Sequence, residues 1–376
     1  MSPDHARGGR RKADRADGKK REPAGPEQVR IMRRKKAVLF LVAFFLVATP
    51  AHAAFGDGGV LEHVESFFRD FFVSVKRVFV RDDRSCPYRV LEGHDYLVWT
   101  VAFNPGGTVL ASGGVDDRII LWEIPSGVQK AFLEGHQNAV ISVAFSPDGR
   151  EIASGGYDKS VFLWDAATGN RVGTGAIHGD NIRAVAYHPS GKWIASAGLD
   201  GKIILWDREK KAVIRQFQEE DMIFSLAFRP DGKILAAGGK ALKIDLWDME
   251  TFEKTGSLEG HTGWVMGLSY SPDGKMLASG GMDHRVMIWN ALSGERLHTL
   301  TGHQSAVFSV SFGPSGRLAS GGDDQHLIVW NGNDGTPLLN YTCVYDYILS
   351  VAFHPSGKWV ATGNEDRAVL LFDLER

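Results

Sequence analysis

One aromatic position recurs at a nearly constant interval through most of this chain of 376 residues. Successive copies are 41 or 42 residues apart, and the seven of them are Trp122, Trp164, Trp206, Trp247, Trp289, Trp330 and Phe372. Each interval also contains short apolar runs, such as residues 143–145, and a turn that combines Pro with Gly. Proline presets the first torsion of a tight turn, and glycine supplies the positive φ that closes it. The chain is therefore predicted to be a series of small β-units that bury their faces against one another.

A histidine, mostly within a Gly-His pair, precedes five of these aromatic residues on the same rhythm. With its Gly-His and Trp-Asp pairs, the segment 87–376 resembles the WD-repeat family. The resemblance implies an all-β fold, namely a seven-bladed β-propeller of four-stranded antiparallel blades. Only three residues follow Asp373, too few for the outer strand of the last blade, whereas residues 88–92 precede a Gly-His pair as residues 129–134 do. We therefore expect the N-terminal strand to complete the seventh blade and close the ring.

Five repeats contain a Ser, an Asp and the Trp at nearly fixed distances after the His. The resemblance implies that each set forms a buried hydrogen-bond chain, in which Asp orients His, His meets Ser and Ser reaches the Trp indole. The same residue types could form a hydrolase triad, but five copies of one catalytic site on one chain are implausible, so a structural role is predicted. The predicted tetrads are His94, Ser112, Asp116 and Trp122; His136, Ser154, Asp158 and Trp164; His178, Ser196, Asp200 and Trp206; His261, Ser279, Asp283 and Trp289; and His303, Ser320, Asp324 and Trp330.

The fourth and seventh repeats depart from this pattern. In the fourth, Glu219, Ala237 and Ala241 replace the polar residues, which predicts that Trp247 has no polar partner. Replacing Glu219 is therefore expected to cost far less stability than replacing Asp200 in a complete tetrad. In the seventh, the His and the Trp are replaced while the Asp is kept, so that the Asp needs another contact; the positions are Val344, Thr362, Asp366 and Phe372.

WD-repeat proteins usually bind peptides on the face that carries the Gly-His loops, so the resemblance also indicates where a partner contacts this chain. Side chains are expected to point outward there at the third and fifth residues after the His and at the residue before the Asp. A solvent-facing surface is ordinarily polar, whereas these positions are rich in Trp, Phe, Tyr and Met, which predicts a protein or peptide partner. The alternative is that some of these side chains pack on one another near the centre of the ring. The predicted partner-binding residues are Leu97, Trp99, Ile141, Tyr157, Arg183, Met222, Phe224, Trp264, Met266, Met282, Phe308, Tyr347 and Leu349.

The first 53 residues have the composition of a targeting segment. Residues 1–36 carry 13 Lys and Arg against 5 Asp and Glu and are predicted to be disordered, with Met32 as the expected true start. Residues 37–53 contain an apolar run and end in Ala-His-Ala, which predicts a signal peptide and an exported protein, periplasmic or secreted. The alternative is that this segment stays uncleaved and anchors the chain in a membrane.

Residues 54–86 are predicted to be a linker that contains an amphipathic helix over residues 60–80. The apolar side chains of this helix, five of which are Phe, recur at helical spacing. The helix is expected either to pack on the propeller or to contact a membrane surface or a partner.

Composition and spacing exclude several kinds of site. After residue 53 the chain carries 30 basic and 40 acidic side chains, which argues against nucleic-acid binding. No paired His or Cys spacing predicts a metal site, and no cofactor is expected. Cys86 and Cys343 fall near opposite ends of outer strands, so they are expected to lie too far apart for a disulfide.

The sequence thus favours a non-catalytic scaffold for protein–protein interaction. A second hypothesis is a structural subunit of an envelope complex that is tethered through residues 60–80. A third hypothesis is a hydrolase or lyase with a site in the central channel, built from groups such as Arg183, Asp323 and Glu365. These three come from separate repeats and match no catalytic motif, which disfavours an enzyme.

Overall fold

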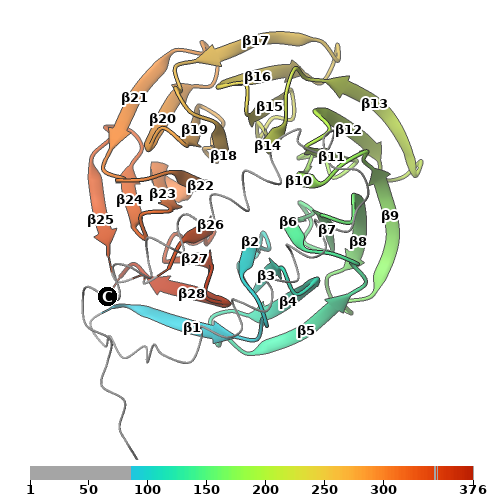
Figure 1. The fold of residues 1–376 in the computed structure, drawn as a ribbon, viewed down its shortest axis with the longest axis horizontal. Helices are drawn as coiled ribbons and strands as arrows, with labels where there is room; N and C mark the ends of the chain where they lie inside the picture. Colours follow the sequence, from blue (N-terminus) through green and yellow to red (C-terminus); the bar gives the residue numbers. More distant parts are fainter. Residues whose placement is uncertain (1–85, 343, 345, 376) are drawn as a thin grey trace, which may run out of the picture. The chain divides into compact units, whose positions relative to one another are not determined.

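The computed structural model describes residues 86–342, 344 and 346–375. The predicted lead 1–36, signal segment 37–53 and helix 60–80 lie outside these residues. Within them the chain forms 28 β-strands, which make up seven four-stranded sheets around a common centre (Figure 1). The prediction of an all-β, seven-bladed propeller with four-stranded antiparallel blades is confirmed.

Each of the first six blades consists of four consecutive strands, numbered from the inner edge to the outer edge. Blade 1 contains β2 (Val98–Phe103), β3 (Val109–Gly114), β4 (Arg118–Glu123) and β5 (Gln129–Glu134), and blade 2 contains β6 (Val140–Phe145), β7 (Glu151–Gly156), β8 (Ser160–Asp165) and β9 (Arg171–Ile177). Blade 3 contains β10 (Ile182–Tyr187), β11 (Trp193–Gly198), β12 (Lys202–Asp207) and β13 (Ala212–Gln218), and blade 4 contains β14 (Ile223–Phe228), β15 (Ile234–Gly239), β16 (Lys243–Asp248) and β17 (Lys254–Glu259). Blade 5 contains β18 (Val265–Tyr270), β19 (Met276–Gly281), β20 (Arg285–Asn290) and β21 (Arg296–Thr301), and blade 6 contains β22 (Val307–Phe312), β23 (Arg317–Gly322), β24 (Leu327–Asn331) and β25 (Pro337–Tyr341).

The seventh blade is completed by the N-terminal strand. It contains β26 (Ile348–Phe353), β27 (Trp359–Asn364) and β28 (Ala368–Asp373), and its outer strand is β1 (Tyr88–Glu92). β1 pairs antiparallel with β28, so that Tyr88 lies opposite Phe372. The predicted closure of the ring by the N-terminal strand is confirmed. The first and last strands of the described chain are therefore joined within one sheet.

The blades pack face to face through their middle strands. β3 is buried along almost its whole length, whereas the outer strand β5 is mostly exposed. The middle strands carry small residues where neighbouring blades meet: a Cβ atom added to Gly113 would lie 2.7 Å from Cγ1 of Val140 in blade 2. These small residues allow the blades to approach closely and to exclude water from the apolar side chains between them.

A row of hydroxyl groups joins the inner strands of neighbouring blades. The third residue of the inner strand is Ser or Thr in five blades, and its oxygen accepts a hydrogen bond from a backbone amide of the next blade. The pairs are Val143 N to Thr100 Oγ1 (3.3 Å), Val185 N to Ser142 Oγ (3.0 Å), Leu268 N to Ser225 Oγ (3.0 Å), Val351 N to Ser309 Oγ (3.0 Å) and Val101 N to Ser350 Oγ (3.1 Å). The last pair crosses the junction where the ring closes. The row is not among the sequence-based predictions, although a hydroxyl recurs at the same position of five repeats.

Replacing Ser350 by Ala is expected to lower the free energy of unfolding by about 1–3 kcal/mol, because the largely buried amide of Val101 then loses its acceptor. Urea unfolding followed by tryptophan fluorescence measures the change. Ser126→Ala is the control, since the Ser126 hydroxyl is exposed and binds within its own turn; its cost is expected to stay within about 0.5 kcal/mol. Equal costs for the two variants would show that the hydroxyl row adds nothing at the closing junction.

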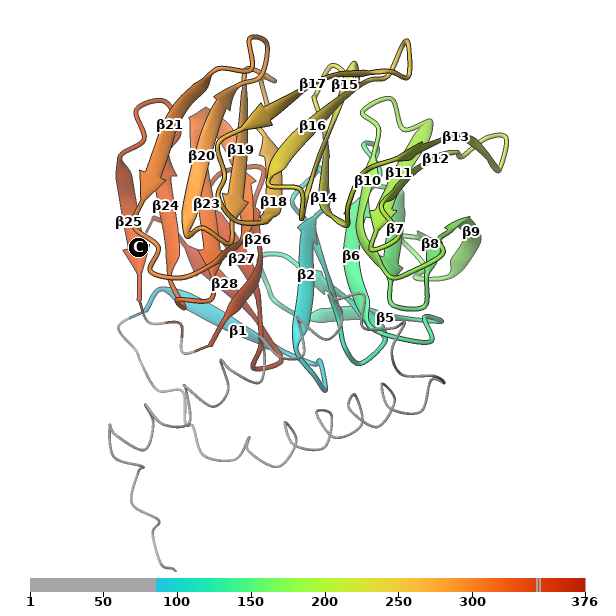
Figure 2. The ribbon, with the colours of Figure 1, turned by 45° about the horizontal axis from the view of Figure 1, so that its top comes forward.

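The outer strands run along the rim of the ring, whereas inner strands such as β2 stand steeply between its two faces (Figures 1 and 2). The end of β25 therefore lies beside the start of β1: the ring centroids of Tyr341 and Tyr88 are 5.1 and 5.2 Å from that of Phe372. Cys86, just before β1, is disulfide-bonded, and Cys343, outside the described residues, is the only other cysteine in the sequence. The prediction against a disulfide is wrong because the twist of each sheet turns its outer strand toward the next blade.

Candidate protein-binding face

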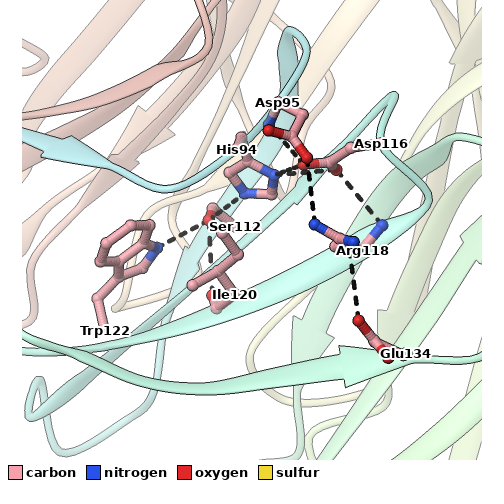
Figure 3. Close-up of polar contacts among 8 residues, drawn as sticks. All are labelled: His94, Asp95, Ser112, Asp116, Arg118, Ile120, Trp122 and Glu134. Carbon is pink, nitrogen blue, oxygen red and sulfur yellow. Dashed lines mark hydrogen bonds and ion pairs between the residues drawn. The ribbon is translucent and has the colours of Figure 1, made fainter.

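A hydrogen-bond chain holds the loop between an outer strand and the next inner strand, as Figure 3 shows for blade 1. The indole N–H of Trp122 donates to Oγ of Ser112 over 2.8 Å, and this Oγ lies 2.7 Å from Nε2 of His94. Nδ1 of His94 donates to the carboxylate of Asp116 over 2.8 Å. Because a carboxylate only accepts, the proton of His94 lies on Nδ1, and Nε2 accepts from the Ser112 hydroxyl. The chain thus satisfies polar groups that lie within the core.

The same chain is present in blades 2, 5 and 6. There the His-to-Ser distances are 2.7, 2.8 and 2.7 Å and the Trp-to-Ser distances are 2.7, 2.9 and 2.8 Å. In blade 3, His178 lies 3.1 Å from Asp200 and 2.8 Å from Ser196. The indole N–H of Trp206 is buried and has no hydrogen-bond partner in the part of the chain that the structure describes. The predicted fourth member is therefore missing from this tetrad.

The five Asp side chains also hold the loop backbone. Each accepts a hydrogen bond of 2.8–3.1 Å from the amide that follows the His, and the donors are Asp95, Gln137, Gly179, Thr262 and Gln304. Burial raises the pKa of Asp158, Asp200, Asp283 and Asp324, but hydrogen bonds from the His rings and the backbone amides outweigh it, so that each pKa lies below its usual value. The carboxylates stay ionised at neutral pH and fix the loops of one face of the ring.

Blade 4 contains a different polar network in place of the tetrad. The indole N–H of Trp247 donates to Oε1 of Glu219 over 2.7 Å, and Nζ of Lys254 lies 3.3 Å from Oε2 of Glu219 and 2.6 Å from Oδ2 of Asp245. The Ser257 hydroxyl donates to the same Asp245. The prediction that Trp247 has no polar partner is wrong, because Glu219 at the His position reaches the indole directly. A visible signal was Asp245, which stands at a strand position that is apolar in the other six repeats.

The two carboxylates of this network have opposite pKa shifts. Burial raises the pKa of Glu219, and its contact with Asp245 raises it further. Burial alone also raises the pKa of Asp245, but the hydrogen bonds from Lys254 and Ser257 outweigh it and lower the pKa overall. Of the two carboxylates, Asp245 therefore keeps its charge to the lower pH, and it makes the shorter contact with Lys254.

Blade 7 replaces the tetrad with aromatic packing. Phe372 stands at the Trp position. The rings of Tyr88, in β1, and Tyr341, in β25 of blade 6, both pack against it. The hydroxyl of Thr362, at the Ser position, donates to Oδ1 of Asn364 over 2.7 Å. Phe372 has no N–H group to donate, so the Thr362 hydroxyl is not needed as an acceptor. It makes its hydrogen bond within its own strand instead.

The predicted partner-binding residues lie at the start of the inner strands and in the turns of the same face. Five of them are buried, with exposed fractions of 5–7%, and these are Ile141, Phe224, Met266, Tyr347 and Leu349. The expectation that they face solvent is wrong. The other eight are half-buried, and they are Leu97, Trp99, Tyr157, Arg183, Met222, Trp264, Met282 and Phe308. Inner strands of seven blades converge on the centre of the ring, so that large side chains at these positions pack on one another.

Five of these thirteen residues form one contact group, which we call the arginine–aromatic cluster: Trp99, Tyr157, Arg183, Phe224 and Trp264. The guanidinium carbon of Arg183 lies 5.2 Å from the ring centroid of Trp99 and 5.7 Å from that of Phe224. The rings of Phe224 and Trp264 are 5.5 Å apart, and Nη1 of Arg183 lies 3.4 Å from the Tyr157 hydroxyl. Because blade 2 stands between blades 1 and 3, the contact of Arg183 with Trp99 joins two blades that are not neighbours.

The groups considered for a catalytic site have contacts of other kinds. Arg183 packs on aromatic rings, and Asp323 accepts a hydrogen bond from the Ser305 hydroxyl while burial raises its pKa. Glu365 is buried in blade 7. Within the described ranges, no group of three or more His, Cys, Asp or Glu side chains is placed to hold a metal ion.

Two relatives match short parts of the chain. A probable cytosolic iron-sulfur protein assembly protein, a CIAO1 homolog of Ixodes scapularis, is 57% identical over 37 residues, which are 10% of this chain and 12% of that protein. Eukaryotic translation initiation factor 3 subunit I of Phaeosphaeria nodorum is 38% identical over 60 residues, which are 15% of this chain and 18% of that protein. The chain thus spans less than a fifth of the length of either relative in these matches.

These relatives contradict the predicted export. One is named for assembly in the cytosol and the other for translation initiation, and neither name describes a periplasmic or secreted protein. Among the residues that the structure describes, no helix is long and apolar enough to cross a membrane. On the relatives alone, the prediction of a periplasmic or secreted protein is wrong. The signal segment 37–53 lies outside the described residues and stays a prediction.

Two family models match consecutive parts of the ring. The model described as the IFT122 first beta-propeller matches residues 97–267, and the model of the WD domain, G-beta repeat, matches residues 252–290, 294–331 and 335–373. The three single-repeat matches end at the last residue of the third strand of blades 5, 6 and 7. The fold has seven four-stranded blades, and His-Ser-Asp-Trp hydrogen-bond networks hold loops of one face. This protein belongs to the WD-repeat β-propeller family.

Proposed function

We propose that this chain is a non-catalytic scaffold that binds a protein or peptide on the face of the Gly-His loops. The observation that carries the proposal is the arginine–aromatic cluster, in which large side chains from blades 1 to 4 and from the loop before blade 5 meet on that one face. Trp, Tyr and Arg are the residue types that contribute most to binding energy at protein interfaces. A cluster of them on a rigid ring is pre-organised, which reduces the entropy lost when a partner binds.

The half-buried members of the face are the proposed contact residues. Trp99, Trp264, Met282 and Phe308 keep part of their apolar surface accessible. Trp99 and Phe308 lie in inner strands, and Trp264 and Met282 lie next to strand ends, where the Met282 amide donates to the Trp264 carbonyl oxygen over 2.8 Å. Of the five buried positions, Phe224 packs against Trp264, with ring centroids 5.5 Å apart. The relatives are named as a subunit of a translation factor and as an assembly protein, and both names describe proteins that act together with others. A docking role for residues 60–80 stays a prediction.

Replacing Trp264 by Ala is expected to weaken partner binding by about 2 kcal/mol, or roughly 30-fold in Kd, because a truncated aromatic anchor leaves a gap at the centre of the interface. The partner is first captured with the full chain, then purified and titrated against both forms by calorimetry. The unfolding temperature of the variant should change little, since Trp264 is half-buried and precedes its strand.

Lys275→Ala is the matched control, because the Lys275 side chain is 77% exposed in a turn of blade 5 on the opposite face. It should leave both the Kd and the unfolding temperature unchanged. If Trp264→Ala unfolds the protein, the residue belongs to the core and the face is wrongly assigned. If the variant folds and binds as before, the partner uses another surface.

A further inference from the structure

The sequence His-Pro-Ser-Gly-Lys-Trp occurs twice, at residues 188–193 and 354–359. Each copy joins the first and second strands of its blade, on the face opposite the Gly-His loops. Nε2 of His188 lies 2.9 Å from the carbonyl oxygen of Gly232 in blade 4, and Nε2 of His354 lies 2.8 Å from that of Gly107 in blade 1. We call His188 and His354 the seam histidines, because each joins its blade to the next. His354 spans the junction where the ring closes.

Gly107 and Gly232, whose carbonyl oxygens accept these hydrogen bonds, lie close against the imidazole rings. A Cβ atom added to Gly107 would lie 2.3 Å from Nε2 of His354, and one added to Gly232 would lie 2.5 Å from Nε2 of His188. Both glycines have a positive φ, of 68° and 76°, in their turns. The turn conformation and the close approach thus both require glycine, and they bring one carbonyl oxygen to each ring.

Both imidazoles are enclosed by aromatic rings. The centroids of Phe103 and Trp359 lie 4.9 and 4.8 Å from that of His354, and the planes of both rings are nearly perpendicular to the imidazole plane. The equivalent rings around His188 are Trp193 and Phe228, at 5.0 and 5.1 Å. Apolar surroundings of this kind disfavour a charged imidazole, because they replace the water that would solvate it.

The hydrogen bonds of the seam histidines fit only the neutral ring. Nδ1 of His354 accepts from the backbone amide of Ser356 over 3.0 Å, and Nδ1 of His188 accepts from that of Ser190 over 3.1 Å. An amide N–H can only donate, so Nδ1 carries no proton, and Nε2 carries the proton that it donates to the glycine carbonyl. Protonation would point a second N–H at the amide. The nearby Ser hydroxyl could turn to accept it, but the amide bond would be lost.

We propose that the two seam histidines make the ring sensitive to mild acid, so that their protonation loosens the junction between blades 7 and 1 and the junction between blades 3 and 4. The first of these is where β1 closes the ring. At the second, the hydroxyl position of the inner strand is occupied by Ala184, so the histidine replaces the Ser or Thr that joins other blades.

The direction of the pH effect follows from the pKa values. Burial lowers the pKa of His354 below its usual 6.5, although the Gly107 carbonyl opposes this. Burial likewise lowers the pKa of His188, against the Gly232 carbonyl and the charge of Asp231. The unfolded chain therefore takes up protons at a higher pH than the folded chain. The stability that the neutral rings contribute is fully present above pH 6.5 and is lost as the pH falls from there through the folded pKa.

Few charged side chains act on the imidazoles of His188 and His354. Asp231 is the charged group that faces His188, and the described groups that contact His354 are two aromatic rings, a serine and a glycine carbonyl. The five tetrad histidines differ, because each has a carboxylate 2.7–3.1 Å from Nδ1 whose negative charge would balance that of a protonated ring. Acid lability is thus specific to the two seams.

The test compares the full chain with H354Q, H188Q and the double variant. The glutamine side chain can donate to the glycine carbonyl and accept from the Ser amide, but it does not titrate. Between about pH 7.5 and about pH 5, the wild type is expected to lose at least about 2 °C more in unfolding temperature than the double variant. H298Q is the matched control, since Nε2 of His298 also lies 3.0 Å from a carbonyl of the next blade, that of Asn333, but at an exposed site.

Hydrogen exchange shows which part of the propeller is loosened by acid. After correction for the intrinsic rate, amides of the 104–109 and 354–359 turns should exchange faster at the lower pH in the wild type and not in H354Q. If the wild type and the double variant have the same pH profile, the proposal is wrong. Should a variant fail to fold at neutral pH, an NMR titration of the imidazole C–H signals in the wild type decides: folded pKa values below 6.5 support the proposal, and values at or above 6.5 overturn it.

Discussion

Replacing Leu91 by Asp is expected to open the ring and to leave no stably folded monomer. Leu91 is the buried residue of β1, 4% exposed, and it packs with Trp122 of blade 1 and with Leu371 of β28. A carboxylate at this place has no cation to pair with in its apolar cluster, and burying an unpaired charge costs several kcal/mol. The same change removes the apolar contact that holds β1 between the first and last blades. A loss of at least about 4 kcal/mol is expected.

Urea unfolding and gel filtration measure this effect together. An opened chain should elute earlier than the wild type, because its radius increases, and its unfolding midpoint should fall below that of every other variant discussed above. Glu92→Ala is the control, since Glu92 is the next residue of β1 and points to solvent. A Leu91→Asp variant with the elution volume and midpoint of the wild type would mean that β1 does not hold the ring closed.

The second large effect concerns the buried hydrogen-bond networks that hold the loops of blades 3 and 4. Asp200→Ala is expected to cost about 3 kcal/mol, because Asp200 accepts hydrogen bonds from Nδ1 of His178 and from the amides of Gly179 and Lys202. Glu219→Ala is expected to cost about 2 kcal/mol, since it leaves the indole of Trp247 without its acceptor. The sequence alone predicts a large cost for the first and almost none for the second.

Chemical unfolding at neutral pH compares the two variants. Glu250→Ala serves as the control, because the Glu250 side chain is 70% exposed. The cost of Asp200→Ala should also shrink in acid: the folded pKa of Asp200 lies below 3.8, so its contribution is present above that pH and is lost as the pH falls through the folded pKa. A cost for Glu219→Ala no larger than that of the control would restore the sequence-based expectation.

The architecture could be predicted because the features that specify it repeat. The Trp, the Gly-His pair and the Pro-Gly turn each recur at the same position of most repeats. A signal repeated through seven repeats can be recognised even where one repeat departs from it. Closure by β1 followed from the missing strand after Asp373. The hydroxyl row from Thr100 to Ser350 repeats in the same way and could have been found, but a Ser in an apolar strand is not by itself a signal of contact between blades.

Apart from export, the predictions that were wrong concern contacts between residues far apart in the sequence. Burial of Phe224 and Tyr347 depends on side chains that meet at the centre of the ring, and sequence spacing gives no distance across it. The bonded state of Cys86 depends on how far each sheet twists. The network of blade 4 was missed because Glu219 was compared with the His that it replaces, while Asp245 and Lys254, which complete the network, stand in other strands.

Closure by the N-terminal strand also has a consequence for how the protein is made. Of the strands of the ring, β1 is synthesised first and its partner β28 last, about 280 residues later, so β1 has no partner in its own chain until the seventh blade has left the ribosome. The entropy of closing so long a loop rises only slowly with its length, by about 0.6 kcal/mol per doubling, so its main effect is on the folding rate. Until β28 of the same chain emerges, β1 has no partner there and can pair with the exposed edge of β28 in a neighbouring nascent chain. Polysomes that hold several copies close together therefore favour exchange of β1 between chains, and slow, well-spaced synthesis favours the closed monomer.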